Sequence, residues 1–277
     1  MKLIDTHAHL NLAEFADDYE KVINDSLERG VFVINVGVNY ASSQRADELA
    51  RQFGEGVYCA IGLHPENIEE EEKPAAKEAA LPEHIKEADF DGELYRELAR
   101  SAQKIVALGE TGLDYLRLPK NAARAEAIRS KQKEVFKKQL ALAKELGLPV
   151  IVHSRLAHED TMAVLRDFTG ASGRINGVMH CFSGSEAEAR EIYDLGMYFG
   201  LNGIIFKLDI AAAVAQLPLD RILLETDCPY LSPIKEVRRN EPRYVSAVAE
   251  RVAQIRRDSV DTIVEAANAN AKKLFGI

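Results

Sequence analysis

The sequence predicts an α/β fold, a single (β/α)8 TIM barrel. Eight short, apolar and β-branched runs alternate with longer amphipathic stretches from one end of the chain to the other. The chain has 277 residues, and about 35 residues per unit suit a closed barrel better than an open sheet. No Ser-, Pro- or Gly-rich linker interrupts the alternation, so we interpret residues 1–277 as one domain.

The elements are expected in the following order. The strands are predicted at 2–8, 31–37, 57–63, 104–110, 149–154, 177–182, 197–203 and 221–226. Helices are predicted between them at 17–30, 42–54, 91–102, 124–147, 159–168, 185–196 and 210–217, and after the last strand at 243–257 and 259–276. Several of these stretches end in glycine, the common stop of a helix.

One segment departs from this pattern. Residues 66–97 carry 12 acidic and 4 basic side chains, so they hold most of the net charge of −9. We interpret about 66–92, which also contains prolines, as an acidic insertion with at most a short helix, exposed to solvent or acting as a lid. The rest of the chain is close to neutral, so the acidic balance does not exclude an anionic substrate.

The composition also bounds the environment of the protein. Its 47% of hydrophobic residues include no apolar run long enough for a membrane span, and the first residues lack the pattern of a signal peptide. Cys59, Cys181 and Cys228 have no paired spacing and are expected as free, mostly buried thiols. We therefore expect a cytoplasmic protein with no membrane partner.

Five of the seven histidines fall near the carboxyl ends of expected strands. His7 and His9 lie two residues apart on the first strand, so their side chains point to the same face. His64 follows the third strand, and His153 and His180 lie on the fifth and sixth. Barrel enzymes build their sites at this end of the strands, so we expect these imidazoles to converge.

Two carboxylates occupy matching places. Glu110 closes the expected fourth strand, and Asp227 follows the eighth. A buried carboxylate needs a partner, which a divalent cation would supply. One catalytic zinc takes three protein ligands, fewer than this set offers. The set therefore predicts two ions about 3.5–4 Å apart that share a carboxylate, with Zn²⁺, Mn²⁺ and Mg²⁺ all open.

The residues resemble a known family. The HxH on the first strand is similar to that of metal-dependent amidohydrolase barrels. Six motifs, in order, resemble the TatD family of metal-dependent deoxyribonucleases: GLHP (62–65), GETGLDY (109–115), LPVIVHSR (148–155), HCFSGS (180–185), LLETDCPYLSP (223–233) and RRNEP (238–242). The ending NANAKKLFGI (268–277) is also similar, whereas the acidic stretch is longer and the loop before RRNEP shorter than is typical.

The resemblance implies two metal ions held by six side chains. His7, His9 and Asp227 would hold one ion, His153 and His180 the other, and Glu110 would bridge them. His64 is expected to contact the substrate phosphate. Arg155, two residues after His153, is a candidate phosphate clamp, with a surface salt bridge as the alternative.

The implied activity is hydrolysis of phosphodiester bonds, as a 3′–5′ exonuclease on single-stranded DNA. Asp227 is the expected general base, with Glu110 and His64 as further catalytic groups. Basic residues on the loop after the eighth strand would track the DNA backbone or cap a helix in solvent; they are Lys235, Arg238, Arg239 and Arg243.

Two other functions use the same residues. A dimetal centre also hydrolyses amides or esters, and the resemblance allows a D-aminoacyl-tRNA deacylase. A metal-binding scaffold without activity would be expected to lack a ligand or Asp227, and none is missing from this sequence. We expect a monomer or a weak oligomer.

Overall fold

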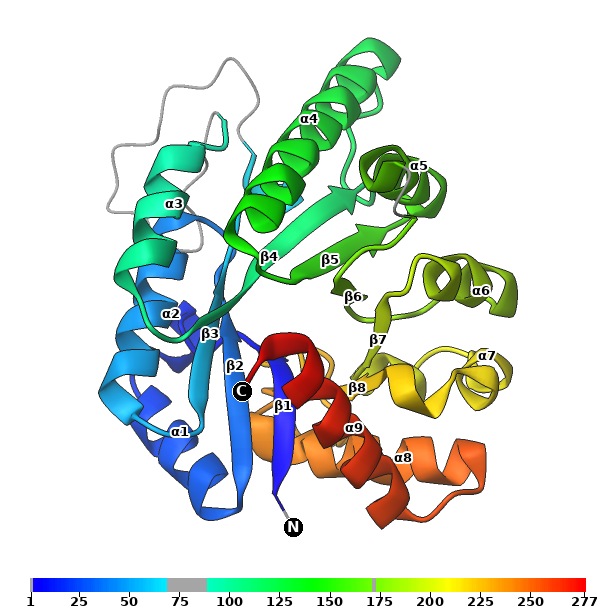
Figure 1. Cartoon of the computed structure of the whole chain (residues 1–277). Coiled ribbons are helices and arrows are strands. Elements are labelled where there is room, and N and C mark those ends of the chain that lie inside the picture. The colour runs from blue at the N-terminus through cyan, green and yellow to red at the C-terminus, as the bar shows by residue number, and fades with distance from the viewer. Residues whose placement is uncertain (1, 69–88, 171–172) are drawn as a thin grey trace.

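A computed structural model describes residues 2–68, 89–170 and 173–277, and it confirms the (β/α)8 barrel. Eight parallel strands form one sheet in sequence order (Figure 1). They are β1 (Leu3–Ala8), β2 (Val31–Val36), β3 (Val57–Ile61), β4 (Ile105–Asp114), β5 (Val150–Arg155), β6 (Gly177–Met179), β7 (Tyr198–Leu201) and β8 (Ile222–Leu224). The strand at each predicted position is present, and most are shorter than expected.

The helices lie outside the ring of strands (Figure 1). They are α1 (Tyr19–Glu28), α2 (Tyr40–Phe53), α3 (Gly92–Ser101), α4 (Ala122–Leu146), α5 (His158–Thr169), α6 (Glu186–Asp194), α7 (Ala211–Gln216), α8 (Val245–Arg256) and α9 (Val260–Phe275). Side-chain caps fix several starts: Asn39 and Ser185 each close a capping box, and Ser259 accepts from the backbone of Thr262. Residues 69–88 of the predicted insertion lie outside the described residues.

The fourth strand corrects the sequence prediction. We expected it to end at Glu110, but β4 continues to Asp114. Its pairing with β5 shifts between Leu108 and Thr111 and then runs on to the pair of Asp114 and Arg155. Gly112 allows this pairing, because it has φ +145° and lies directly against the backbone of β5. Residues 111–114 therefore extend the strand, which has an irregular register.

The barrel closes between β8 and β1 through a few specific bonds. The backbone N–H of Asp227 donates to the carbonyl of His7 at 2.8 Å, and that of His9 donates to the carbonyl of Cys228 at 2.9 Å. Asp5 accepts from the backbone and the hydroxyl of Thr226, and burial raises the pKa of this carboxyl to about 8. The closure therefore places the first strand, β1, beside the last strand, β8.

The barrel interior is apolar at the amino end of the strands. Every strand contributes a buried residue to one cluster, which also contains three residues of α9, Ala271, Leu274 and Phe275. The amides of Asn268 and Asn270 donate to carbonyls of Lys2 and Ile222, at the starts of β1 and β8. The last helix thus closes this end of the barrel.

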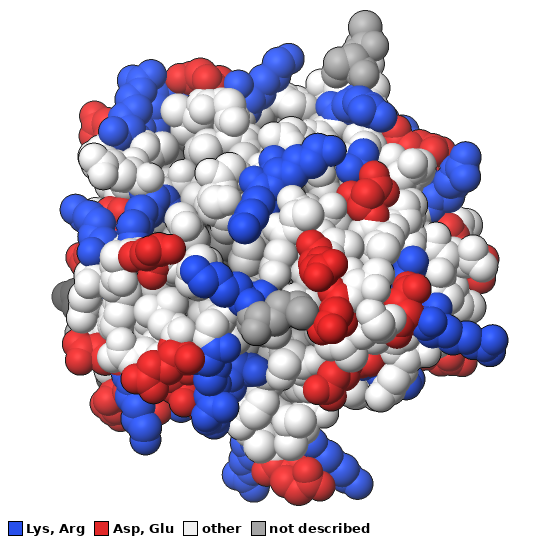
Figure 2. Space-filling view, turned by 60° about the horizontal axis from the view of Figure 1, so that its bottom comes forward, with Lys and Arg blue, Asp and Glu red and all other residues white. Residues whose placement is uncertain are grey.

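The outside of the molecule carries both signs of charge. On the face drawn in Figure 2, Lys and Arg side chains are interspersed with Asp and Glu. Among residues 2–68, 89–170 and 173–277, no helix combines the length and the apolar character that a bilayer crossing requires. Cys59, Cys181 and Cys228 are free thiols, as predicted.

Candidate metal centre

The alternation of the strands aims the polar side chains into the barrel. Along three strands, an apolar interior residue comes two positions before a polar residue at the carboxyl end. The runs are Ile151 and His153, Val178 and His180, and Leu223 followed by Glu225 and Asp227. Each strand therefore changes from core to site along one face.

On β1, a shift in the pairing register turns the histidine side chains into the barrel. Ile4 belongs to the interior cluster, so strict alternation would turn His7 to the outside. The pairing of β1 with β2 shifts between Asp5 and Ala8. Beyond the shift His7 and His9 lie together, with their Nε2 atoms 3.1 Å apart, as their spacing predicted.

Glu110 lies at the centre of the cluster, with one oxygen toward each of two groups of histidines. Its Oε2 is 3.3 Å from Nε2 of His7 and 3.7 Å from Nε2 of His9. Its Oε1 is 2.7 Å from Nδ1 of His153 and 3.7 Å from Nε2 of His180. Burial opposes ionisation of Glu110, but the surrounding imidazoles outweigh it and hold its pKa well below the ordinary value.

Asp227 faces the same space from the loop after β8. Its Oδ1 lies 3.4 Å from Nε2 of His9 and 3.8 Å from Nε2 of both His7 and His180. Despite burial, the neighbouring imidazoles of His180 and His9 lower its pKa. Its backbone has φ +58°, a conformation that is uncommon outside glycine and is found at functional sites.

Three of the histidines have one ring nitrogen fixed by the protein. Nδ1 of His9 lies 2.9 Å from the carbonyl of Val36, and Nδ1 of His180 lies 2.8 Å from Oε1 of Glu225. Nε2 of His153 lies 2.9 Å from Oδ2 of Asp114. In each case the other nitrogen faces Glu110 or Asp227. This is how proteins orient histidines that bind a metal, and the donor set fits divalent cations.

His64 differs from these histidines, because the ring nitrogen that the protein fixes accepts a hydrogen bond. Its Nδ1 accepts from the backbone N–H of Glu66 at 3.1 Å, so the proton of the neutral ring is on Nε2. That nitrogen lies 3.5 Å from Oε1 of Glu110. Burial lowers the pKa of His64, so the ring is neutral near pH 7. His64 therefore presents an N–H donor to the site.

Arg155 is joined to the cluster through Asp114. Its Nε donates to Oδ2 of Asp114, and its Nη2 donates to Oε1 of Glu66, both at 2.6 Å. The same oxygen of Asp114 contacts His153. Burial opposes ionisation, but these partners lower the pKa of Asp114 to about 2. The carboxylate of Asp114 thus orients both His153 and Arg155, the predicted phosphate clamp.

Arg239 and Arg243, two of the predicted basic residues after β8, lie in ion pairs. Nη1 and Nη2 of Arg239 donate to the two oxygens of Asp18 at 2.8 and 2.6 Å, and Nη2 also contacts Glu241 at 3.1 Å. Its guanidinium lies over the ring of Phe15. Arg243 contacts Asp25 and Glu241. These bonds tie the loop to the segment after β1, and a role of Arg239 toward substrate stays a prediction.

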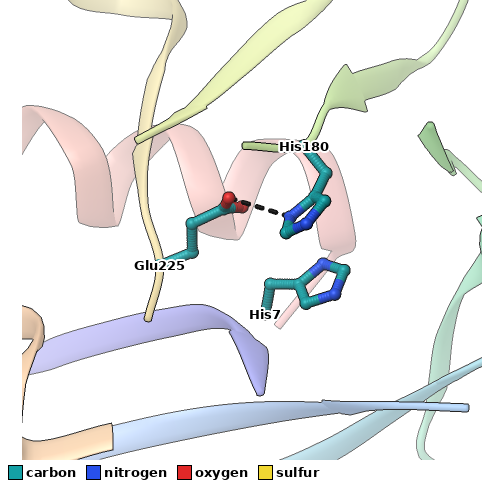
Figure 3. A group of neighbouring side chains, drawn as sticks. All are labelled: His7, His180 and Glu225. Atoms are coloured by element: carbon teal, nitrogen blue, oxygen red, sulfur yellow. Dashed lines mark ion pairs between the residues drawn. The ribbon is translucent and has the colours of Figure 1, made fainter. Parts of the chain in front are cut away.

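Two carboxylates of the site, Glu225 and Asp114, were not predicted from the sequence. Glu225 points to His180, whose ring stacks on His7 with ring centroids 3.6 Å apart (Figure 3). Gly200 makes room for the Glu225 carboxylate, which a Cβ there would meet. The alternation of Leu223, Glu225 and Asp227 could have revealed it. Asp114 was missed because it lies beyond the expected end of its strand.

The fold and the site together define a class of protein. Histidines gathered around a shared carboxylate at the carboxyl ends of a parallel barrel are typical of metal-dependent hydrolases, and this chain is one. The family model described as TatD related DNase matches residues 4–276. The chain belongs to this family, as its motifs predicted.

Relatives and a solved structure agree with this assignment. The chain is 37% identical to an uncharacterized metal-dependent hydrolase, YabD of Bacillus subtilis, over 99% of both chains. It is 33% identical to the 3′-5′ ssDNA/RNA exonuclease TatD of Erwinia amylovora, over 99% of this chain and 100% of that one. The crystal structure of YJJV, a TatD homolog from Escherichia coli, superposes with a TM-score of 0.82 at 28% identity, over 99% and 98%.

Proposed function

We propose that the chain is a two-metal phosphodiesterase that removes nucleotides from the 3′ end of single-stranded DNA. The observation that carries the proposal is the position of Glu110, which turns one oxygen toward His7 and His9 and the other toward His153 and His180. A carboxylate placed in this way can be shared by two cations. The relatives named as exonucleases support the choice of substrate.

Six side chains would hold the two cations. They are His7, His9 and Asp227 on one side, His153 and His180 on the other, and Glu110 between them. Divalent cations in such a site lower the pKa of the attacking water and neutralise charge on the phosphoryl group. The nitrogen and oxygen donors suit Zn²⁺ and Mn²⁺, and Mg²⁺ is a third candidate.

The protein's own groups then have separate roles. Asp227 is ionised and its side chain is partly open to solvent, so its carboxylate can accept the proton of the attacking water. His64 donates from Nε2 to a phosphoryl oxygen as charge develops there. The side chain of Arg155 is 39% exposed, and it binds the phosphate beside His64.

The test is hydrolysis of 5′-labelled single-stranded DNA. Protein stripped of metal by a chelator receives Mg²⁺, Mn²⁺ or Zn²⁺ one at a time, and the products are separated by length. We expect a ladder that shortens one nucleotide at a time and depends on the added ion. The same oligonucleotide with phosphorothioate linkages at its 3′ end is the control, and it should resist cleavage.

Two results would contradict the proposal. Equal cleavage of the blocked and the free oligonucleotide would show that the enzyme does not need the 3′ end. No cleavage with any of the three ions would direct attention to amide and ester substrates, beginning with D-aminoacyl-tRNA, since the same ligands serve attack on a carbonyl carbon.

A further inference from the structure

Large apolar side chains are exposed at one part of the barrel mouth. Eight such side chains are exposed among residues 2–68, 89–170 and 173–277, and five of them lie on loops that follow β4, β5, β7 and β8. They are Leu116, Leu156, Phe206, Leu208 and Tyr230. Because the strands are parallel, these loops emerge at the same end of the barrel as Glu110 and Asp227.

Several of the described apolar side chains after β1 and β3 are buried. After β1, the side chains of Leu10, Leu12 and Phe15 are buried, and after β3 Leu63 is buried. Among the described ranges 2–68, 89–170 and 173–277, the exposed large apolar side chains at this end of the barrel therefore lie after β4, β5, β7 and β8. Exposed apolar groups on loops beside a site offer a surface to the apolar parts of a ligand.

Basic side chains accompany these apolar ones along the chain. Leu116 is followed by Arg117, Leu156 follows Arg155, and Lys207 stands between Phe206 and Leu208. The loops after β4 and β5 are neighbours, since the N–H of Tyr115 donates to the carbonyl of Arg155 at 2.9 Å. Nη2 of Arg155 and Nε of Arg117 both contact Oε1 of Glu66, at 2.6 and 3.5 Å. Proteins bind single-stranded nucleic acids with cations that contact the backbone and with aromatic side chains, here Phe206 and Tyr230, on which bases stack.

Tyr230 lies beside the proposed metal centre. It lies three residues after Asp227, and its N–H donates to the Asp227 carbonyl at 2.9 Å. Its ring centroid is 6.4 Å from that of His9, and half of the residue's surface is exposed. A base stacked on this ring would place its own phosphate at the edge of the histidine cluster.

We propose that these five side chains form a base-binding rim, on which unpaired bases of the substrate lie while Arg155, Arg117 and Lys207 contact its backbone. This rests on the proposed nuclease function and adds the reason for a preference for single strands. In a duplex the faces of the bases are stacked on each other and cannot reach the rim. Stacking tolerates every base, so little sequence preference is expected.

The test compares two oligonucleotides of equal length, an oligothymidine and one whose last three sugars at the 3′ end are abasic. The wild type should have a kcat/KM at least ~10-fold higher for the oligothymidine, because stacking contributes at each base. In Tyr230→Ala this ratio should fall by about 5- to 10-fold. Phe206→Ala should also lower it, because Phe206 is the other exposed aromatic side chain of the rim.

Tyr193→Ala is the matched control. Tyr193 is also an exposed tyrosine, but it lies on the outer helix α6, and its replacement should leave the ratio at the wild-type value. Equal kcat/KM of the wild type for the two oligonucleotides would overturn the rim. So would a Tyr230→Ala variant whose ratio stays at the wild-type value.

Binding separates the rim from the nuclease function. Fluorescence anisotropy of the same two oligonucleotides, labelled at the 5′ end, reports affinity even if neither is cleaved. A preference for the oligothymidine that Tyr230→Ala abolishes would support the rim even if no cleavage occurs. In that case only the proposed nuclease activity would be rejected. Equal affinity of the wild type for both oligonucleotides would reject the rim whatever the activity.

Discussion

The two ends of the barrel are built from the same strands and have opposite characters. At the amino end, residues such as Ile4 and Leu223 pack with Leu274 and Phe275 of α9 in a closed apolar cluster. At the carboxyl end, the same strands present imidazoles and carboxylates around Glu110. Stability should therefore depend mainly on one end and chemistry on the other.

The change from one end to the other occurs within two residues of a strand. Ile151 belongs to the apolar cluster, and His153 contacts Glu110. The buried polar groups of the carboxyl end contact one another, which offsets the cost of burying them. A metal ion would stabilise this end further, whereas the amino end is complete without one.

The largest expected effect is that of Glu110→Gln. The amide keeps the size of the side chain but cannot offer two anionic oxygens to the two histidine groups, so hydrolysis should fall by at least ~10³-fold. Single-turnover hydrolysis of the labelled oligonucleotide measures this loss. Glu265→Gln, on the exposed side of α9, is the control and should retain the wild-type rate.

Asp227→Asn tests the general base. It should reduce kcat by at least ~100-fold, because the amide does not accept the proton of water. Its circular dichroism spectrum should match that of the wild type. A rate within a few fold of the wild type would remove Asp227 from this role and leave it as a ligand only.

Asp114→Asn tests the carboxylate that the sequence did not reveal. The amide holds Nε2 of His153 less well in its present orientation, and affinity for metal should fall by about 10- to 100-fold. Calorimetric titration of the stripped protein with Zn²⁺ measures this directly. Wild-type affinity would mean that Asp114 serves only to hold Arg155.

Proton release should accompany metal binding. In the metal-free protein, burial lowers the pKa values of His153 and His180, but carboxylates outweigh it and raise them to about 9 and about 10. Both rings are then protonated at pH 7.5 and must lose their protons to bind a cation. Calorimetry in two buffers of different ionisation enthalpy should detect this release, and affinity should rise with pH as protons compete less. A heat that is the same in both buffers would contradict it.

The smallest effect on catalysis is expected at the amino end. Phe275→Ala removes a buried ring from the contact of α9 with the barrel interior and should cost about 3–5 kcal/mol of stability. At a temperature where the variant is folded, its kcat should stay within about 2-fold of the wild type. Urea unfolding and hydrolysis assays together check both parts. A large loss of kcat in the folded variant would show that the two ends are coupled.

Much of the fold followed from the sequence, because strand alternation and helix caps are local signals. The positions of His7, His9, His64, His153 and His180 at one end of the barrel were predicted from the ends of the strands. The register shifts in β1 and β4 were not, since a bulge depends on the partner strand. Asp114 was missed for this reason.

Long-range polar contacts were also invisible in the sequence. Thr226 donates a hydrogen bond to Asp5, which lies near the other end of the sequence. Arg239 likewise donates to Asp18 on the segment after β1. Such pairs arise only once the barrel has closed, because closure brings the first and last strands together. A basic loop after β8 is therefore evident in the sequence, but its engagement with acidic partners is not.

The most direct test of the central claim is to locate the metal ions in crystals. Crystals of the protein loaded with Zn²⁺ or Mn²⁺ would be measured at the absorption edge of the metal. We expect two anomalous peaks about 3.5–4 Å apart, one on each side of the Glu110 carboxylate. A single peak, or two peaks that do not share Glu110, would contradict it.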